Sequence, residues 1–283
     1  METINHKEKQ NKFAYKEVIF ESWKDMKDYL FSFSSQNEKV KYVFRGHADS
    51  EWQLQPTIDR LNLGNAVSTE LKAIADFKKD ITIFTQANEI SFLDYPKNDE
   101  KDLNWLAFMQ HHGAATRLLD FSDSPFIATF FAMSNVYVKE KEKCIWAIPL
   151  NWIDTKNMSF ITDRGKSLDI IYEGLKVDQN NKYNILGYSY LTKQFERLFR
   201  QQGCFIYSMS SKISFYELLG TYFDNSTLEN SPLLKLTLKS KNHKEEILAA
   251  IADLKFMNIT YSSLFPDLDG FSKDILLSEA YSK

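Results

Sequence analysis

The segment Val43-Phe44-Arg45-Gly46-His47 places an arginine, a glycine and a histidine directly after an apolar stretch. The guanidinium group of arginine offers a planar fork of hydrogen-bond donors that suits a phosphate or a carboxylate. Because glycine has no side chain, Gly46 lets a ligand approach the backbone closely. An arginine that forms an ordinary salt bridge at a strand end is the structural alternative. Arg45, Gly46 and His47 are therefore candidate ligand-binding residues.

The segment Gln110–Asp120 is the second place where polar residues of site-forming types concentrate. His111 and His112 fall in the last turn of an expected helix, where the helix dipole favours their protonated forms. Adjacent helical residues point in different directions, so the two histidines are a poor pair of ligands for one metal ion. We expect a ligand contact from His111 and no metal site.

After Gly113 the chain passes through Thr116 and Arg117 into a short apolar strand, and Asp120 follows. Arg117 and Asp120 suit a ligand site, but buried arginine and aspartate are usually paired with each other. The sequence leaves both interpretations open for this pair.

Ser122 and Ser124 precede an expected helix that begins with Pro125. A helix N-terminus exposes unpaired N–H groups and attracts anions. Here the signal is weakened, because proline lacks one of those donors and Asp123 repels an anion. A ligand site and a plain helix cap remain alternatives.

A charged stripe of Lys193, Arg197 and Arg200 follows one face of an expected helix that ends at Gln201. Such stripes usually face solvent, and the alternative is a rim that faces phosphate groups. Gln201 and Gln202 then precede a glycine. Their amides are placed to orient a hydroxylated ligand or to cap the helix.

Asp267 and Asp269 resemble a fragment of a cation-binding loop, but too few oxygen ligands follow for an EF-hand. A turn is the expected role, because proline, aspartate and glycine favour turns. The chain contains no P-loop, Rossmann glycine fingerprint, Gly-x-Ser-x-Gly elbow, His-Glu-x-x-His motif or Cys/His zinc cluster.

Apolar periodicity and cap residues predict the elements that position these side chains. The predicted helices cover residues 66–84, 103–112, a segment starting at 124–125, 190–201 and 244–256. The predicted strands cover residues 40–44, 117–121, 143–150, 204–209 and 233–238. Because strands and helices mix without strict alternation, we predict an α+β fold with a central, partly antiparallel split sheet flanked by helices.

The composition is that of an ordinary globular protein, with 43% hydrophobic and 26% charged residues among 283. The net charge of −3 gives no overall attraction to nucleic acid or to an anionic membrane. We expect a flexible N-terminus over residues 1–12, and a single domain over 13–283 with a possible insertion at 151–183. No signal peptide or membrane span is predicted, so a cytoplasmic location is expected.

The two cysteines, Cys144 and Cys204, lie in apolar runs that resemble strands. Two cysteines in a chain of this length make a disulfide framework improbable, and a reducing compartment fits better. We expect both to be buried free thiols.

Together these segments resemble the FRG-domain family of bacterial and phage proteins. The order of the motifs carries the resemblance, which runs from about residue 42 to 275. The matching stretches are Phe44-Arg45-Gly46, Trp52-x-Leu54-x-Pro56, Gln110-His111-His112-Gly113, Thr116-Arg117-Leu118-Leu119-Asp120, Ser124-Pro125 with Ala128 and Phe131-Ala132, Gln201-Gln202-Gly203 and Leu264–Gly270. Ala115 stands where the family often has proline.

A more distant resemblance is to ADP-ribosyltransferases. It implies that Arg45 holds the phosphates or ribose of NAD, and that the hydroxyl of Ser122 or Ser124 braces the nicotinamide pocket. The third motif of that fold supplies a glutamate to a ribose hydroxyl, and it should fall just before or within Gln202–Ser208. This chain has Gln201 and Gln202 there, and an amide offers no negative charge to a cationic transition state.

These observations support three hypotheses. The first is an NAD-consuming ADP-ribosyltransferase-like toxin or anti-phage effector, with a protein or nucleic-acid acceptor. The second is a non-catalytic module that senses a nucleotide or a phage component. The third is a nuclease or other phosphoryl-transfer enzyme that uses His47, His111, Asp120, Asp267 or Asp269.

The first hypothesis assigns catalytic roles to Arg45 and Gln202, and it makes NAD a substrate. Ligand binding is assigned to a larger set of side chains, namely Gly46, His47, His111, Thr116, Arg117, Asp120, Ser122, Ser124 and Gln201.

Overall fold

Seven strands form one mixed sheet in the described part of this computed structural model. The structure describes residues 13–281 except 36–39, 62–65, 87–89, 95–100, 136–137, 139, 163–183, 192–194, 211–212 and 225–230. The strand order across the sheet is β1-β7-β4-β2-β3-β6-β5. The strands are β1 (Lys16–Phe20), β2 (Tyr42–His47), β3 (Leu119–Ser122), β4 (Lys143–Pro149), β5 (Leu186–Ser189), β6 (Gly203–Ser208) and β7 (Leu234–Leu238).

The sheet has two well-paired halves that meet at a weak junction between β2 and β3. Strand β2 is antiparallel to β4 over all of its residues, from Tyr42 opposite Pro149 to His47 opposite Cys144. By contrast, one residue pair joins β2 to β3, Phe44 opposite Ser122. We call this junction the seam. The remaining pairs are antiparallel, apart from the parallel pair of β1 with β7.

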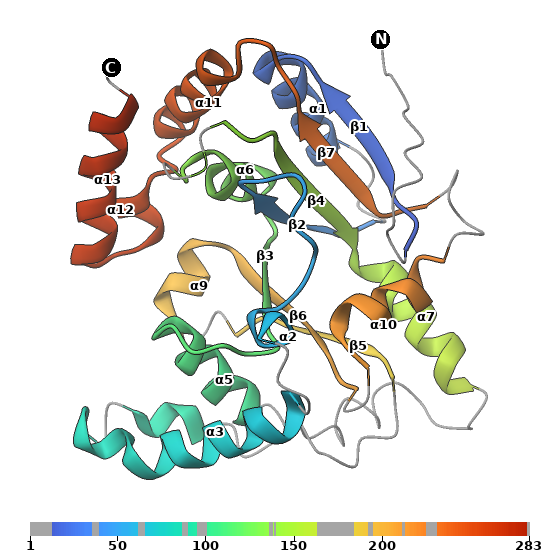
Figure 1. The fold of residues 1–283 in the computed structure, drawn as a ribbon, viewed down its shortest axis with the longest axis vertical. Helices are drawn as coiled ribbons and strands as arrows, with labels where there is room; N and C mark the ends of the chain where they lie inside the picture. The colour runs from blue at the N-terminus through green and yellow to red at the C-terminus, as the bar shows by residue number, and fades with distance from the viewer. Residues whose placement is uncertain are drawn as a thin grey trace.

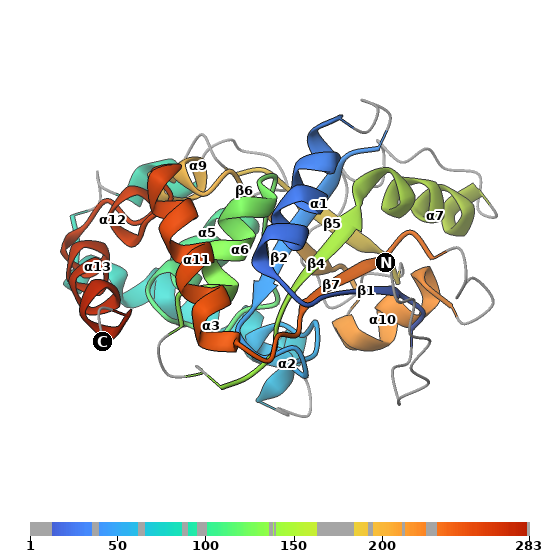
Figure 2. The same cartoon turned by 90° about the horizontal axis from the view of Figure 1, so that it is seen from above.

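Three helices cover one face of the β1-β7-β4-β2 half: α1 (Trp23–Ser35), α6 (Pro125–Met133) and α11 (His243–Phe256), as Figures 1 and 2 show. Alternate strand residues point toward them, because side chains of a strand alternate between its faces. The core on this face includes Phe44, Ile145 and Leu236 from the strands. Helix α6 lies directly behind β2 and β3, so it forms one wall of the seam.

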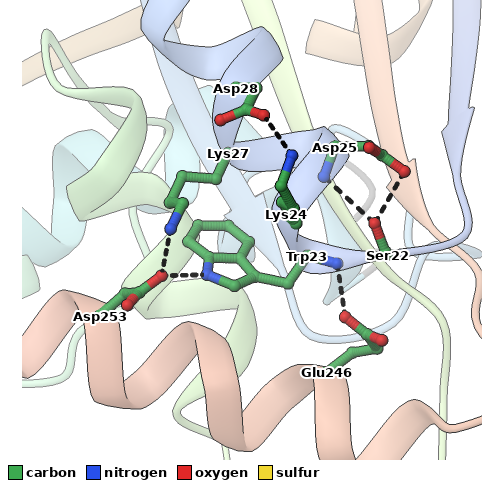
Figure 3. Close-up of polar contacts among 8 residues, drawn as sticks. All are labelled: Ser22, Trp23, Lys24, Asp25, Lys27, Asp28, Glu246 and Asp253. Atoms are coloured by element: carbon green, nitrogen blue, oxygen red, sulfur yellow. Dashed lines mark hydrogen bonds and ion pairs between the residues drawn. The ribbon is translucent and has the colours of Figure 1, made fainter.

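Polar contacts join α1 to α11 at the edge of this layer (Figure 3). The indole Nε1 of Trp23 and the Nζ of Lys27 donate to Asp253 Oδ2 at 2.8 and 2.7 Å. The hydrogen bonds from Lys27 and then Trp23 hold the pKa of Asp253 below its ordinary value. The backbone N–H of Trp23, at the start of α1, donates to Glu246 Oε2 at 2.6 Å. The bond to Glu246 satisfies one of the donors that a helix N-terminus leaves unpaired.

The opposite face of the sheet packs against α7 (Leu150–Thr162) and α10 (Phe215–Tyr222). Ser214 caps α10 with a reciprocal capping box that involves Glu217. Both cysteines lie in this core as free thiols, as predicted, and burial raises their pKa values to about 12.

Two further groups of helices flank the β3-β6-β5 half and the end of α6 (Figure 1). The first group packs on the outer side of β6 and contains α2 (Thr57–Arg60), α3 (Ala66–Asp80), α5 (Lys101–His111) and α9 (Glu196–Arg200), with short 3-10 turns at Ile81–Ile83 and Ser91–Asp94. The second group packs on α6 and α11 and contains α12 (Tyr261–Leu264) and α13 (Leu268–Tyr281).

The predicted fold class is confirmed, and all five predicted strands occur with boundaries shifted by at most three residues. The helix predicted over 190–201 is wrong in its first half, because α9 begins at Glu196 and Phe195 is extended. Leu191 and Phe195 instead pack into the core beneath α3 and α5. The predicted helix over 66–84 ends at Asp80 and continues as a 3-10 turn.

In the described part of the chain, the local patterns did not identify two strands, β1 and β5, or six helices, α1, α2, α7, α10, α12 and α13. The expected flexible segment 1–12 lies outside the described residues. Of the possible insertion at 151–183, the first part belongs to α7 and residues 163–183 also lie outside the described residues.

Candidate functional site

A cavity of about 340 Å³ opens at the seam, where β2 and β3 stop pairing. Its walls come from β2, β3, β6, α5, α6 and α9, and we call it the first cavity. The polar residues that line it are Arg45, Gln110, His111, Asp120, Ser122, Arg197 and Gln201. Its aromatic residues are Phe44, Phe121, Phe131, Phe195 and Phe205.

Arg45 extends from β2 across the seam. Its Nη1 donates to the backbone oxygen of Asp120 at 2.7 Å, and the same nitrogen lies 3.8 Å from Asp120 Oδ2. Its Nε donates to Nε2 of His47 at 3.2 Å. One N–H on Nε and one on Nη1 are used in this way, out of five on the guanidinium group. Arg45 therefore keeps donors for an anionic ligand.

Asp120 is oriented by a chain of hydrogen bonds from the end of α5. Gln110 Nε2 donates to Asp120 Oδ1 at 2.9 Å. The hydroxyl of the buried Thr116 donates in turn to Gln110 Oε1. Asp120 is thus held between Gln110 and Arg45, and it is the one carboxylate among the described residues that line the first cavity.

Gly46 lines the first cavity, but the close approach that it permits is mainly that of α6. A Cβ atom at this position would overlap the backbone oxygen of Ala128 and crowd the backbone of Ala132. The sequence predicted that Gly46 makes room for a ligand. In the structure most of that room is occupied by the helix, which lets α6 lie against β2 at the seam.

His47, the last residue of β2, is buried and does not line the first cavity. Its Nδ1 lies 3.2 Å from the backbone oxygen of Trp52, and its Nε2 accepts from Arg45, so the neutral ring carries its proton on Nδ1. Burial, followed by the positive charge of Arg45, lowers the pKa of His47 to about 3. His47 positions Arg45 and remains uncharged at neutral pH.

His111 lines the first cavity next to Arg197. The helix dipole was expected to favour its protonated form, but burial and then Arg197 lower the pKa of His111. Burial and neighbouring positive charge therefore oppose the protonated form of His111. Arg197 places its guanidinium 4.1 Å from the ring centre of Phe265 at the rim of the cavity. Lys193, predicted on the same stripe, lies outside the described residues.

The two candidate serines differ in their surroundings. Ser122 lines the cavity, but its hydroxyl donates to the backbone oxygen of Gln201 at 2.7 Å and accepts from the backbone N–H of Ser124. Ser124 is the predicted N-cap of α6, where its Oγ accepts from the N–H of Ile127, and it is not among the residues that line the cavity.

The two glutamines at the end of α9 also differ in burial and in their position relative to the first cavity. Gln201 lines the first cavity and is buried, with its Nε2 donating to the backbone oxygen of Leu264 at 3.2 Å. Gln202 is exposed, has a left-handed φ of 47° and is not among the lining residues. Its backbone oxygen accepts from the N–H of Asp123 at 2.9 Å. Gln202 therefore belongs to the turn that leads into β6.

Arg117 is paired with Glu70 of α3 in the core, away from the first cavity. Glu70 accepts hydrogen bonds from both the backbone N–H and the Nε of Arg117, and the two side chains are 1% and 8% exposed. The sequence suggested Asp120 as its partner, 3 residues along the chain. Glu70 lies 47 residues away, and no local pattern indicates it.

Gln110, Arg197 and the aromatic walls were not among the predicted site residues. Gln110 belongs to the Gln110-His111-His112-Gly113 motif, so its place in the motif was the available signal. Arg197 was visible only as part of a charged stripe, and the five phenylalanines looked like ordinary core residues.

The groups named for phosphoryl transfer do not gather at one point. His47 faces Trp52, while Asp267 accepts from the N–H of Gly270. Asp269 and Gly270 belong to the first turn of α13 rather than to the expected turn, so Asp267 caps that helix. The described residues contain no group of three or more His, Cys, Asp and Glu side chains that could hold a metal ion. Among the helices described, none has the length and apolar character needed to cross a membrane.

Comparison with protein families matches residues 40–141 to the FRG domain. The matched region contains β2, α3, α5, β3 and α6, and so it contributes Arg45, Gln110 and Asp120 to the first cavity. No curated protein and no solved structure matches the chain. The remaining walls, from α9 and β6, lie outside the matched region.

Proposed function

This chain carries an FRG domain, and from that premise we propose that its first cavity binds a nucleotide-type ligand and cleaves NAD as an ADP-ribosyltransferase-like enzyme does. The observation that carries the proposal is the convergence at the seam. Arg45 and Arg197 line one cavity from β2 and α9, and five phenylalanines complete its walls. Asp120 lies in the same cavity, held by Gln110 and Arg45.

The charges of the first cavity suit a diphosphate at its rim. Arg45 and Arg197 are cationic, Asp120 is anionic and His111 has a lowered pKa, so the balance near the rim is positive. Arg45 retains guanidinium donors after its bonds to Asp120 and His47. A guanidinium group binds phosphate through two parallel hydrogen bonds, which positions the ligand as well as attracting it.

The aromatic walls suit the planar rings of a dinucleotide. Aromatic side chains stack on bases of any sequence, because every base presents a π face. The five phenylalanines lie on five different elements: β2, β3, β6, α6 and the residue before α9. Phe131 and Phe195 are the partly exposed members of this set, so we expect their rings to contact a base.

Asp120 takes the role that the distant resemblance assigned to a third-motif residue. Gln202 is exposed and outside the lining, and Gln201 is engaged with Leu264. When the bond between the ribose carbon and the nicotinamide nitrogen breaks, its electron pair leaves with nicotinamide and positive charge develops on the sugar. A nearby carboxylate stabilises that charge. Water or an acceptor nucleophile then bonds to the ribose carbon and loses a proton.

The test is release of nicotinamide from NAD by the purified chain, with and without bacterial lysate as a source of acceptors. We expect release by the wild type and a loss of about 100-fold or more in Asp120→Asn and Arg45→Ala. Arg200→Ala is the control, because Arg200 is exposed on α9, pairs with Glu196 and does not line the cavity. Its activity should stay within about twofold of the wild type.

The reaction products distinguish a glycohydrolase from a transferase. Free ADP-ribose identifies a glycohydrolase, whereas label attached to protein or nucleic acid identifies a transferase and makes a toxin or anti-phage role testable in cells. Equal turnover in Asp120→Asn would refute the assignment of the carboxylate.

A nucleotide-sensing module without catalysis is the second candidate. The observation that favours it is the hydrogen bonding of Asp120 to Gln110 together with its ion pair to Arg45, which partly neutralises the carboxylate. In that case NAD or another nucleotide raises the melting temperature of the wild type but not of Arg45→Ala, and no nicotinamide is released.

A further inference from the structure

A second cavity, of about 250 Å³, lies on the sheet away from the seam and shares no lining residue with the first. It is bounded by β1, β4 and β7, by the start of α10 and by the loop 50–54. That loop carries Trp52 and Leu54 of the Trp-x-Leu-x-Pro motif, which the first cavity does not use. We propose that the second cavity binds a small zwitterion of the amino-acid type.

Lys235 of β7 supplies a buried cation. Its side chain is 8% exposed, and its Nζ forms one ion pair, with Glu17 Oε1 at 3.5 Å. The same nitrogen lies 5.7 Å from the ring centres of Tyr15 and Trp146. An ammonium group has three donors, and buried charges normally satisfy them. Lys235 therefore has donors left for a carboxylate in the cavity.

Trp146 of β4 lies beside Lys235 in the sheet register, and both residues line the cavity. Its Nε1 is buried and has no hydrogen-bond partner among the described residues. The indoles of Trp23 and Trp152, in contrast, donate to Asp253 and to the backbone oxygen of Tyr222. Buried donors without partners are rare in native proteins, so an absent acceptor is the simplest explanation.

The opposite charge lies on the loop that borders the cavity. Glu51 is exposed, and its carboxylate makes no hydrogen bond or ion pair with the described residues. Its neighbour Trp52 is 45% exposed and offers a ring face that attracts a cation. Glu142, also in the lining, is already paired with Lys239 at 2.7 Å. Glu51 and Trp52 are thus the groups that remain for a ligand ammonium.

The charge pattern excludes a phosphate as the preferred ligand. Three glutamates line the cavity, Glu17, Glu51 and Glu142, and they oppose a group with two negative charges. A zwitterion suits the cavity better, because its carboxylate can pair with Lys235 and Trp146 and its ammonium group can pair with Glu51. Phe13, Tyr15, Leu54 and Tyr216 add apolar walls, which suit an aromatic or aliphatic side chain.

Calorimetric titration of the full chain tests the ligand chemistry with three matched probes. L-Phenylalanine carries both charges, N-acetyl-L-phenylalanine lacks the ammonium, and L-phenylalaninamide lacks the carboxylate. We expect L-phenylalanine to bind at least about tenfold more tightly than either analogue, because each analogue leaves a charged partner unpaired. Absence of binding by L-phenylalanine, or equal binding of all three, would overturn the proposal.

Variants then locate the binding. Trp146→Phe keeps a ring and removes the unpaired N–H, so the fold should keep its melting temperature while L-phenylalanine binds about tenfold more weakly. Trp23→Phe removes an indole N–H that is already bonded, and it should lower the melting temperature without changing the affinity. Glu51→Gln changes an exposed side chain and should weaken binding in a folded protein. Wild-type affinity in both Trp146→Phe and Glu51→Gln would overturn the assignment to this cavity.

Discussion

At the scale of single residues, neighbours rather than residue type decide what each arginine does. Arg45 and Arg117 both lie in conspicuous motifs. Arg117 is buried against Glu70 and joins α3 to the chain before β3, whereas Arg45 crosses the seam to Asp120 with donors to spare. The same guanidinium group is structural in one place and available for a ligand in the other.

Gly46→Ala should destabilise the fold by about 3 kcal/mol, because the added methyl group overlaps the backbone of α6 and a backbone atom cannot move aside cheaply. Gly113→Ala is the control. Gly113 has a φ of 89° and no atom within 4 Å of a Cβ placed there, so it should cost only about 1 kcal/mol of backbone strain. Chemical denaturation measures both, and equal costs would show that crowding by α6 is not the cause.

His47 predicts a pH dependence of stability. Its pKa is about 3 in the folded chain, against an ordinary value of 6.5. Between these values the unfolded chain binds more protons, so the contribution of His47 to the free energy of unfolding falls as the pH drops below about 6.5. In His47→Gln the decline between pH 7 and pH 4 should be shallower. Parallel curves for the two proteins would contradict the assignment.

At the scale of elements, single carboxylates join helices to segments that are distant in the sequence. Glu70 of α3 accepts from the backbone of Arg117, and Glu246 of α11 accepts from the first N–H of α1. Both contacts join helices to segments far away in the sequence. The positions of α1 and α3 therefore depend on single side chains as well as on their apolar faces.

Glu246→Ala should lower the free energy of unfolding by about 1 kcal/mol, since it removes the acceptor for the N–H of Trp23 at the start of α1. Asp28→Ala is the matched control on α1 itself. Asp28 pairs with Lys24 in solvent, where such pairs contribute little, so no measurable change is expected. Urea denaturation of both variants is the measurement. A loss in Asp28→Ala as large as that in Glu246→Ala would speak against the capping role.

At the scale of the whole molecule, the seam holds the first cavity and is the most weakly paired junction of the described sheet. Strands β2 and β4 share six residue pairs, whereas β2 and β3 share one. A cavity at a poorly paired junction is open to a ligand that bridges the two halves. Arg45 and Asp120 already make the contacts that such a ligand would extend or replace.

Rates of backbone amide hydrogen exchange should show that the sheet opens most easily at the seam. Segments with few backbone hydrogen bonds open first, so peptides that cover β3 should exchange faster than peptides that cover β4, which is paired on both sides. Addition of NAD should slow exchange in β2 and β3 more than in β1 and β7. Exchange in β3 that is as slow as in β4 would show that the seam is not a line of local opening.

The sequence by itself determined the fold class, the five predicted strands, the Ser124 cap of α6 and the motifs that supply much of the first cavity. These features depend on local signals, namely apolar alternation, cap residues and polar residues at strand ends. The Phe44–His47 and Gln110–Asp120 segments also identified the two strands that meet at the seam, because Arg45 and Asp120 stand where those strands stop pairing.

Only the tertiary structure decided which polar residues face the cavity. Glu70 pairs with Arg117, although the two residues are 47 apart in the sequence. The turn at Gln202 leaves Gln201, and not Gln202, facing the first cavity. Leu191 and Phe195 pack in the core, and the helix expected over 190–201 begins only at Glu196. The second cavity depends likewise on β1, β4 and β7, whose adjacency no local pattern indicates. The physical reason is common to all of them: burial and pairing energies arise between segments distant in sequence, and these energies override local preference.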